Sequence, residues 1–190
     1  MEFDGKQSPE IVYASSLAGT PEKLRRLRNE LLKKFEGYAS LLEECNSDPV
    51  AADAAMVEKG ICTEAELLNI YAGIFEVEAP EEDMIIKPER FPGISWEYLS
   101  SKGMLPAEWN EENIKVYISN PYNLVNNAFF CSRQLKKSMS YTLVRRTLLE
   151  RLINAVYKES EPETSVNADS EDALRSMAGE ARISSSVRPS

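Results

Sequence analysis

A chain of 190 residues carries 43% hydrophobic and 28% charged side chains, and its formal net charge at pH 7 is -9. The negative charge argues against nucleic acid as the main partner, because a phosphate backbone is bound by a basic surface. No uncharged apolar run approaches the ~20 residues of a membrane span, and the first residues lack the pattern of a signal peptide. We therefore expect a cytoplasmic protein of one or two small domains, without direct membrane insertion.

The composition also removes most catalytic chemistries. The sequence has no histidine, which excludes Ser-His and Cys-His nucleophile pairs and His-ligated metals. Cys45, Cys62 and Cys131 are widely spaced and odd in number, which predicts buried thiols and not a zinc site or a disulfide framework. The glycine motifs that cradle phosphates are missing as well. A small enzyme is the least favoured interpretation, and we predict no catalytic, cofactor-binding or metal-binding residues.

Residues 20–75 are predicted to form a helical unit, preceded by a flexible arm over 1–19. Thr20 and Pro21 predict the N-cap and the first position of the first helix. The apolar residues that follow recur every three to four positions, which predicts one buried face. They are Leu24, Leu27, Leu31, Phe35, Tyr38 and Leu42.

Two shorter helices are expected after the first. One runs over about residues 50–59 and ends at Gly60, a residue that favours helix termination. The other begins at Thr63, which forms a capping box with Glu66. An acidic, proline-rich connector over 76–103 follows, and it contains one short helix that ends at Gly103.

Residues 104–158 are predicted to form a small α/β unit. The segments 104–109 and 114–119 alternate as the two strands of a hairpin, with a polar turn between them. Asn120 and Pro121 then predict the N-cap and first position of a helix.

A further strand is expected over 141–146, and Thr147 with Glu150 predicts a second capping box at the start of the last helix. The order is β-β-α-β-α, and its β-α-β step should be a right-handed parallel crossover. The predicted fold class is therefore α+β, with a helical unit followed by a small mixed sheet. Residues 159–190 are acidic and serine-rich, which predicts a disordered tail or linker.

The basic residues gather in the first helix of this acidic chain. Between residues 23 and 34 the only acid is Glu30. A cluster of one sign in an oppositely charged protein indicates a partner surface, and a merely solvated helix face is an equally weighted alternative. The predicted partner-binding residues are Arg25, Arg26, Arg28, Lys33 and Lys34.

Four segments in order resemble one protein family. They are MVEKGICTEAELLNIYAGIF (56–75), MLPAEWNEENIKVYISNPYNLVNNAFF (104–130), YTLVRRTLLERLINAVY (141–157) and SEDALRSMAGEARI (170–183). Together they resemble the N-terminal domain of the type II secretion and type IV pilus assembly ATPases. The Walker motifs, arginine fingers and metal-binding cysteines of that family's motor would lie beyond these segments. The resemblance thus implies the N-terminal domain without the ATPase core, either as a piece of a longer protein or as a naturally short one.

In that family the domain is a non-catalytic docking module. The resemblance implies that it ties a cytoplasmic motor to an inner-membrane platform protein, so that the chain would be peripheral to the membrane through its partner. Some members instead bind cyclic di-GMP through a repeated motif, which makes a cyclic-dinucleotide sensor of the same fold the alternative. Only one approximate copy of the motif is present here, with Ala51, Ala52 and Asp53 in place of Arg-Leu-Gly and Ile74 in place of Gln. We therefore do not expect this ligand, and no cofactor is predicted.

Overall fold

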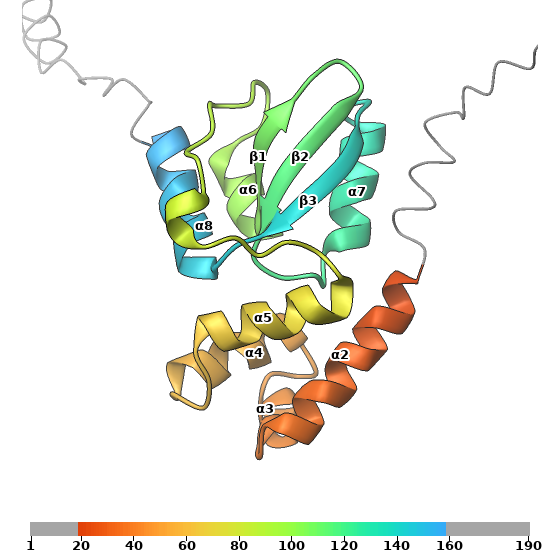
Figure 1. Ribbon diagram of the computed structural model, residues 1–190, viewed down its shortest axis with the longest axis vertical. Helices are drawn as coiled ribbons and strands as arrows, with labels where there is room; N and C mark the ends of the chain where they lie inside the picture. The colour runs from red at the N-terminus through yellow and green to blue at the C-terminus, as the bar shows by residue number, and fades with distance from the viewer. Residues whose placement is uncertain (1–18, 159–190) are drawn as a thin grey trace, which may run out of the picture. The chain divides into compact units, whose positions relative to one another are not determined.

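The computed structural model describes residues 19–158 (Figure 1). The predicted arm over 1–19, apart from Gly19, and the predicted tail over 159–190 lie outside the described residues. Helices come first, followed by a region of mixed helices and strands. No helix among the described residues is long and apolar enough to span a membrane. The initial helices are α2 (Thr20–Lys34), α3 (Tyr38–Glu44), α4 (Pro49–Glu58) and α5 (Glu64–Phe75).

The first predicted helix is two helices in the structure. α2 ends at Lys34, Phe35 adopts an extended backbone, and Gly37 has a φ of 87° immediately before α3. Glycine adopts this left-handed conformation at little steric cost, so the chain can bend there. Both helices nevertheless bury the apolar residues of the predicted stripe, including Leu27 and Tyr38. The periodicity predicted the buried face, but not the bend within it.

The starts of the helices were predicted with mixed success. The capping box of α5 is confirmed: Thr63 Oγ1 accepts from the Glu66 backbone N–H at 3.2 Å, and the Glu66 carboxylate accepts from the Thr63 N–H at 2.8 Å. The N-cap role of Thr20 was wrong, because Gly19 occupies that position and Thr20 is a buried residue within α2. α4 begins at Pro49, and Asp48 caps it by accepting from the Val50 N–H at 3.0 Å.

A three-stranded mixed sheet forms the second part of the structure. β1 (Met104–Trp109) pairs antiparallel with β2 (Asn113–Ile118), and β2 pairs parallel with β3 (Ser138–Leu143). The order in the sheet is β1-β2-β3. The predicted α+β class and mixed sheet are therefore confirmed.

The helices of this second part pack on the sheet. α6 (Trp96–Lys102) contacts β1, α7 (Leu124–Arg133) contacts β3, and α8 (Arg146–Ile153) contacts β1 and β2. A 3-10 turn, η1 (Glu82–Met84), lies in the connector, and α8 continues into a widened turn, η2 (Asn154–Lys158). The apolar side chains of β2 that face the core, among them Ile114 and Val116, are fully buried.

Three boundaries in this region differ from the predictions. Asn120 does not cap a helix: its side-chain oxygen accepts from the Tyr122 N–H at 3.0 Å and closes a turn, and α7 begins later, at Leu124. β3 starts at Ser138 instead of residue 141, because pairing with β2 along its whole length overrides the weak strand preference of serine. Arg145, not Thr147, is the N-cap of α8, so the second capping box was wrong.

The capping box of α5 gives a stability prediction. Replacing Thr63 with Ala removes the acceptor of the Glu66 N–H, and we expect the free energy of unfolding to fall by about 1 kcal/mol. Urea denaturation followed by circular dichroism would measure it. Thr63→Ser keeps the hydroxyl and serves as the control, with a much smaller expected loss. Equal losses for the two variants would contradict the proposed role of the hydroxyl.

Candidate functional site

The five predicted partner-binding residues all lie on the exposed sides of α2. Arg25, Arg26, Arg28, Lys33 and Lys34 are exposed, whereas Leu27 and Leu31 between them are fully buried. Arg26 and Lys33 are seven residues apart and share one face of the helix. Arg25 and Arg28 lie on a neighbouring face. The basic residues therefore surround the solvent side of α2 and do not form one narrow stripe.

Part of this positive charge is compensated within the chain. Arg25 donates to the Glu22 carboxylate at 2.5 Å, one turn away on the same helix. Lys23 pairs with Glu76 at 3.3 Å, and the Lys34 ammonium lies 5.5 Å from the centre of the Phe35 ring. The ion pairs among the described residues do not include Arg26, Arg28 or Lys33. The role of these side chains in binding a partner stays a prediction.

A buried carboxylate, which the sequence analysis missed, joins the two parts of the structure. Asp53 on α4 is only 4% exposed, and its side chain accepts hydrogen bonds from three tyrosine hydroxyls. Tyr38 Oη donates to Oδ1 at 2.7 Å, Tyr122 Oη donates to Oδ2 at 2.6 Å, and Tyr71 Oη also donates to Oδ2. We call these four residues the Asp53 cluster. It links α3, α4 and α5 with the turn that precedes α7.

The protonation chemistry of the Asp53 cluster follows from its burial. Removal from water raises the pKa of Asp53, because burial penalises the charged form, and the three donated hydrogen bonds act in the opposite direction. Burial first, and the nearby carboxylate second, raise the pKa of Tyr38 and Tyr71, so both hydroxyls keep their protons. The tyrosines are fixed as donors and the carboxyl group as the acceptor. This arrangement suits a structural tie and offers no free base to a substrate.

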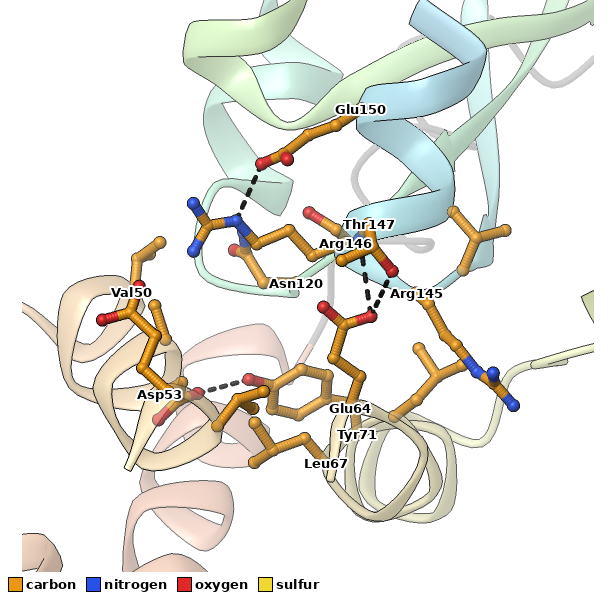
Figure 2. Close-up of a pocket in the computed structure, with 16 residues that line it drawn as sticks. Val50, Asp53, Glu64, Leu67, Tyr71, Asn120, Arg145, Arg146, Thr147 and Glu150 are labelled. Atoms are coloured by element: carbon orange, nitrogen blue, oxygen red, sulfur yellow. Dashed lines mark hydrogen bonds and ion pairs between the residues drawn. The ribbon is translucent and has the colours of Figure 1, made fainter. Parts of the chain in front are cut away.

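A cavity of about 300 Å³ lies beside the Asp53 cluster (Figure 2). α4 and α5 supply one side, and the exit of β2 and the start of α8 supply the other. Its apolar lining includes Val50, Val57, Leu67 and Val144, and Asp53 and Tyr71 form part of the same wall. The polar residues at its edge are Glu58, Glu64, Ser119, Asn120, Arg145, Arg146, Thr147 and Glu150.

Two polar contacts organise the edge of this cavity, and both appear in Figure 2. Glu64 on α5 accepts from the Thr147 hydroxyl at 2.7 Å and from the Thr147 backbone N–H at 3.4 Å. A carboxylate is favoured there because the first turn of a helix presents unpaired N–H groups. Arg146 pairs with Glu150, one turn along α8, at 2.9 Å. Thr147 thus receives its partner from a distant helix and not from the local Glu150 that the capping box predicted.

The cysteines behave largely as predicted. Cys62 and Cys131 are buried thiols, and Cys45 is half-buried; all three are free. Burial raises the pKa of Cys62 to about 11 and that of Cys131 to about 12, so both thiols are protonated at neutral pH. A protonated, buried thiol is a poor nucleophile. Their role is core packing.

Comparisons with known proteins give a structural match only. No family model matches the sequence, and no curated protein matches it either. Among solved structures, the N-terminal domain of XpsE is similar in two crystal forms. One has a TM-score of 0.51 at 15% identity, and the other has a TM-score of 0.47 at 17% identity. Each match covers 83% of this chain and 99% of the XpsE domain.

This chain has the fold of the XpsE N-terminal domain. The conclusion rests on the match with a TM-score of 0.51, and at this sequence identity it concerns the fold alone. It confirms the fold that the resemblance implied, including the order of helices and the mixed sheet that follows them.

The Asp53 cluster gives a second stability prediction. Tyr122→Phe removes one donor and leaves a buried carboxylate short of a partner, so we expect a loss of about 1–3 kcal/mol in unfolding free energy. Chemical denaturation of the parent and the variant would measure the loss. Tyr141→Phe is the matched control, because Tyr141 is half-buried and its hydroxyl has no hydrogen-bond partner among the described residues. Losses of the same size for both would show that Tyr122 does not tie the two parts together.

Proposed function

We propose that this chain is a non-catalytic docking domain of a secretion or pilus assembly ATPase, and that it binds the cytoplasmic part of an inner-membrane platform protein. The observation that carries the proposal is the shared fold with the N-terminal domain of XpsE, a type II secretion ATPase. The ordered sequence resemblance to the same family supports it. Under this proposal the chain resides in the cytoplasm and reaches the membrane only through its partner.

Two features of the chain favour docking over chemistry. The sequence has no histidine and no phosphate-binding glycine loop. The buried polar groups of the Asp53 cluster are engaged with one another, which leaves them unavailable as an acid or a base. In this proposal, ATP hydrolysis belongs to a motor domain outside the residues that resemble the N-terminal domain.

The exposed basic residues of α2 are the proposed contact with the partner. Arg26, Arg28 and Lys33 lack ion-paired acids among the described residues, so they are free to meet an acidic surface. Complementary charge raises the rate of association and fixes orientation more than it adds affinity. We therefore propose an acidic platform surface that approaches α2 from its solvent side.

Reversing the charges of Arg25, Arg26 and Arg28 to Glu tests this contact. The fold should remain intact, because exposed substitutions usually change stability by no more than about 0.5 kcal/mol. Capture of the platform protein's cytoplasmic domain, measured by surface plasmon resonance, should weaken at low salt. The deficit should shrink at high salt, where charges are screened.

A control variant carries the same change in net charge away from α2. Lys87 and Arg90 in the connector and Arg151 on α8 are exposed, and their reversal to Glu should leave capture close to that of the parent. If the α2 variant binds like the parent at low salt, the docking face lies elsewhere, with the exposed side of α7 around Phe129 as the next surface to test.

Cyclic di-GMP should bind weakly or not at all. The single partial motif places Asp53 where the family motif has glycine, and here Asp53 is buried in hydrogen bonds with tyrosines. The neighbouring cavity is lined by further carboxylates, including Glu58 and Glu64, which repel a dianionic ligand. Isothermal titration calorimetry on the full chain would detect binding. Micromolar or tighter affinity would favour the sensor alternative instead of simple docking.

A further inference from the structure

A groove runs between α4 and α8. The charge of its lining is opposite to that of the exposed side of α2. The cavity of about 300 Å³ described above adjoins a second cavity of about 560 Å³. Both volumes lie in the range of about 300–1,000 Å³ that is typical of binding pockets. We call the two together the α4–α8 groove. The residues that line both cavities include Val50, Ala54, Glu58, Asn120, Arg146 and Glu150.

The wall supplied by α4 includes three alanines. Ala51, Ala54 and Ala55 line the groove and recur at spacings that place them, with Glu58, on one face of the helix. Leu149 and Ile153 on α8 line the opposite wall. Alanine fills little volume beside its helix, so the groove has room for aliphatic side chains from another polypeptide. The shape and the apolar walls therefore fit a peptide segment.

The charged residues at the edge of the groove favour basic peptide segments over acidic ones. Four acidic residues outside the Asp53 cluster line it, against two basic ones, and one of the two, Arg146, is already paired with Glu150. Glu58 is exposed and takes no part in the ion pairs among the described residues. The balance is negative, which disfavours phosphates and acidic peptides. The charged residues are Asp48, Glu58, Glu64, Glu150, Arg145 and Arg146.

We propose that the α4–α8 groove binds a basic peptide segment of a partner protein. An aliphatic side chain of that segment packs against Ala54, and a neighbouring lysine or arginine lies beside Glu58. The argument rests on charge complementarity together with the apolar, small-residue wall. It is independent of the α2 surface, whose partner must be acidic. The chain would thus hold two partners, or two parts of one partner, through surfaces of opposite sign.

The test uses the full chain and a fluorescein-labelled synthetic peptide built from Leu, Ala and Lys. We expect saturable binding by fluorescence anisotropy, and weaker binding of the counterpart in which Glu replaces each Lys. Glu58→Lys should lower the affinity for the basic peptide about fivefold or more at low salt. Glu111→Lys is the matched control, because Glu111 is exposed on the β1–β2 turn and does not line the groove. Equal losses for the two reversals would overturn the proposal, since they would reflect net charge alone.

Filling the groove gives a second, uncharged test. Ala54→Leu should reduce affinity about tenfold by occupying the space that the peptide's side chain needs. Circular dichroism verifies its fold. If this variant does not fold, chemical-shift changes in the parent decide: shifts confined to residues of the groove support the proposal, and shifts centred on other elements overturn it.

Self-association is the competing outcome. The basic α2 of a second copy could occupy the groove, and sedimentation velocity of the parent alone would then show concentration-dependent association that Glu58→Lys abolishes. That result would replace the partner segment with a second copy of this chain. A monomeric parent that binds the basic peptide supports the proposal.

Discussion

The structure depends on one buried carboxylate. Asp53 lies in the interior of the molecule, where an unpaired charge would be strongly disfavoured. Three tyrosine hydroxyls from separate segments satisfy it: Tyr38 from α3, Tyr71 from α5 and Tyr122 from the turn before α7. Because each donor must reach the same two oxygen atoms, the cluster fixes the helices to one another and to the sheet region. Removing any one of these three hydroxyls leaves the buried Asp53 carboxylate without one of its hydrogen-bond donors.

Helix α4 contributes to both the Asp53 cluster and the proposed α4–α8 groove. α4 directs Asp53 into the cluster and presents Ala54 and Glu58 to the groove that it forms with α8. The tyrosines that hold Asp53 therefore also hold the groove's alanine wall in place. α2, which packs on α5 and α3, presents the opposite charge to solvent. The two proposed recognition surfaces, α2 and the α4–α8 groove, thus lie on helices that pack in one framework, in keeping with the docking role that we propose.

Local signals predicted the elements whose stability is local. The Thr63 capping box, the hairpin of β1 and β2 and the end of α6 at Gly103 were all found from the sequence, because their hydrogen bonds join residues close in the chain. The signals failed where a distant residue took over a local role. Thr147 and Glu150 match the sequence pattern of a capping box. In the structure, however, the Thr147 hydroxyl donates to the carboxylate of Glu64, which lies 83 positions earlier in the sequence. Asn120 failed as a cap for a local reason instead: its side chain accepts from the N–H of Tyr122, two residues away, and closes a turn, so α7 starts only at Leu124.

The sequence by itself determined the α+β class, the order of helices and strands apart from the break between α2 and α3, and the basic character of the first helix. The signals for these properties, the spacing of apolar residues and the local clustering of charge, lie among residues close together in the chain, so no tertiary information was needed. Only the tertiary structure decided that Asp53 meets three tyrosines and that small residues of α4 form a groove with α8. Tyr38, Tyr71 and Tyr122 share no spacing with Asp53 that a periodic pattern could detect. Their meeting results from helices packing on a sheet, and long-range packing leaves no signature in one sequence.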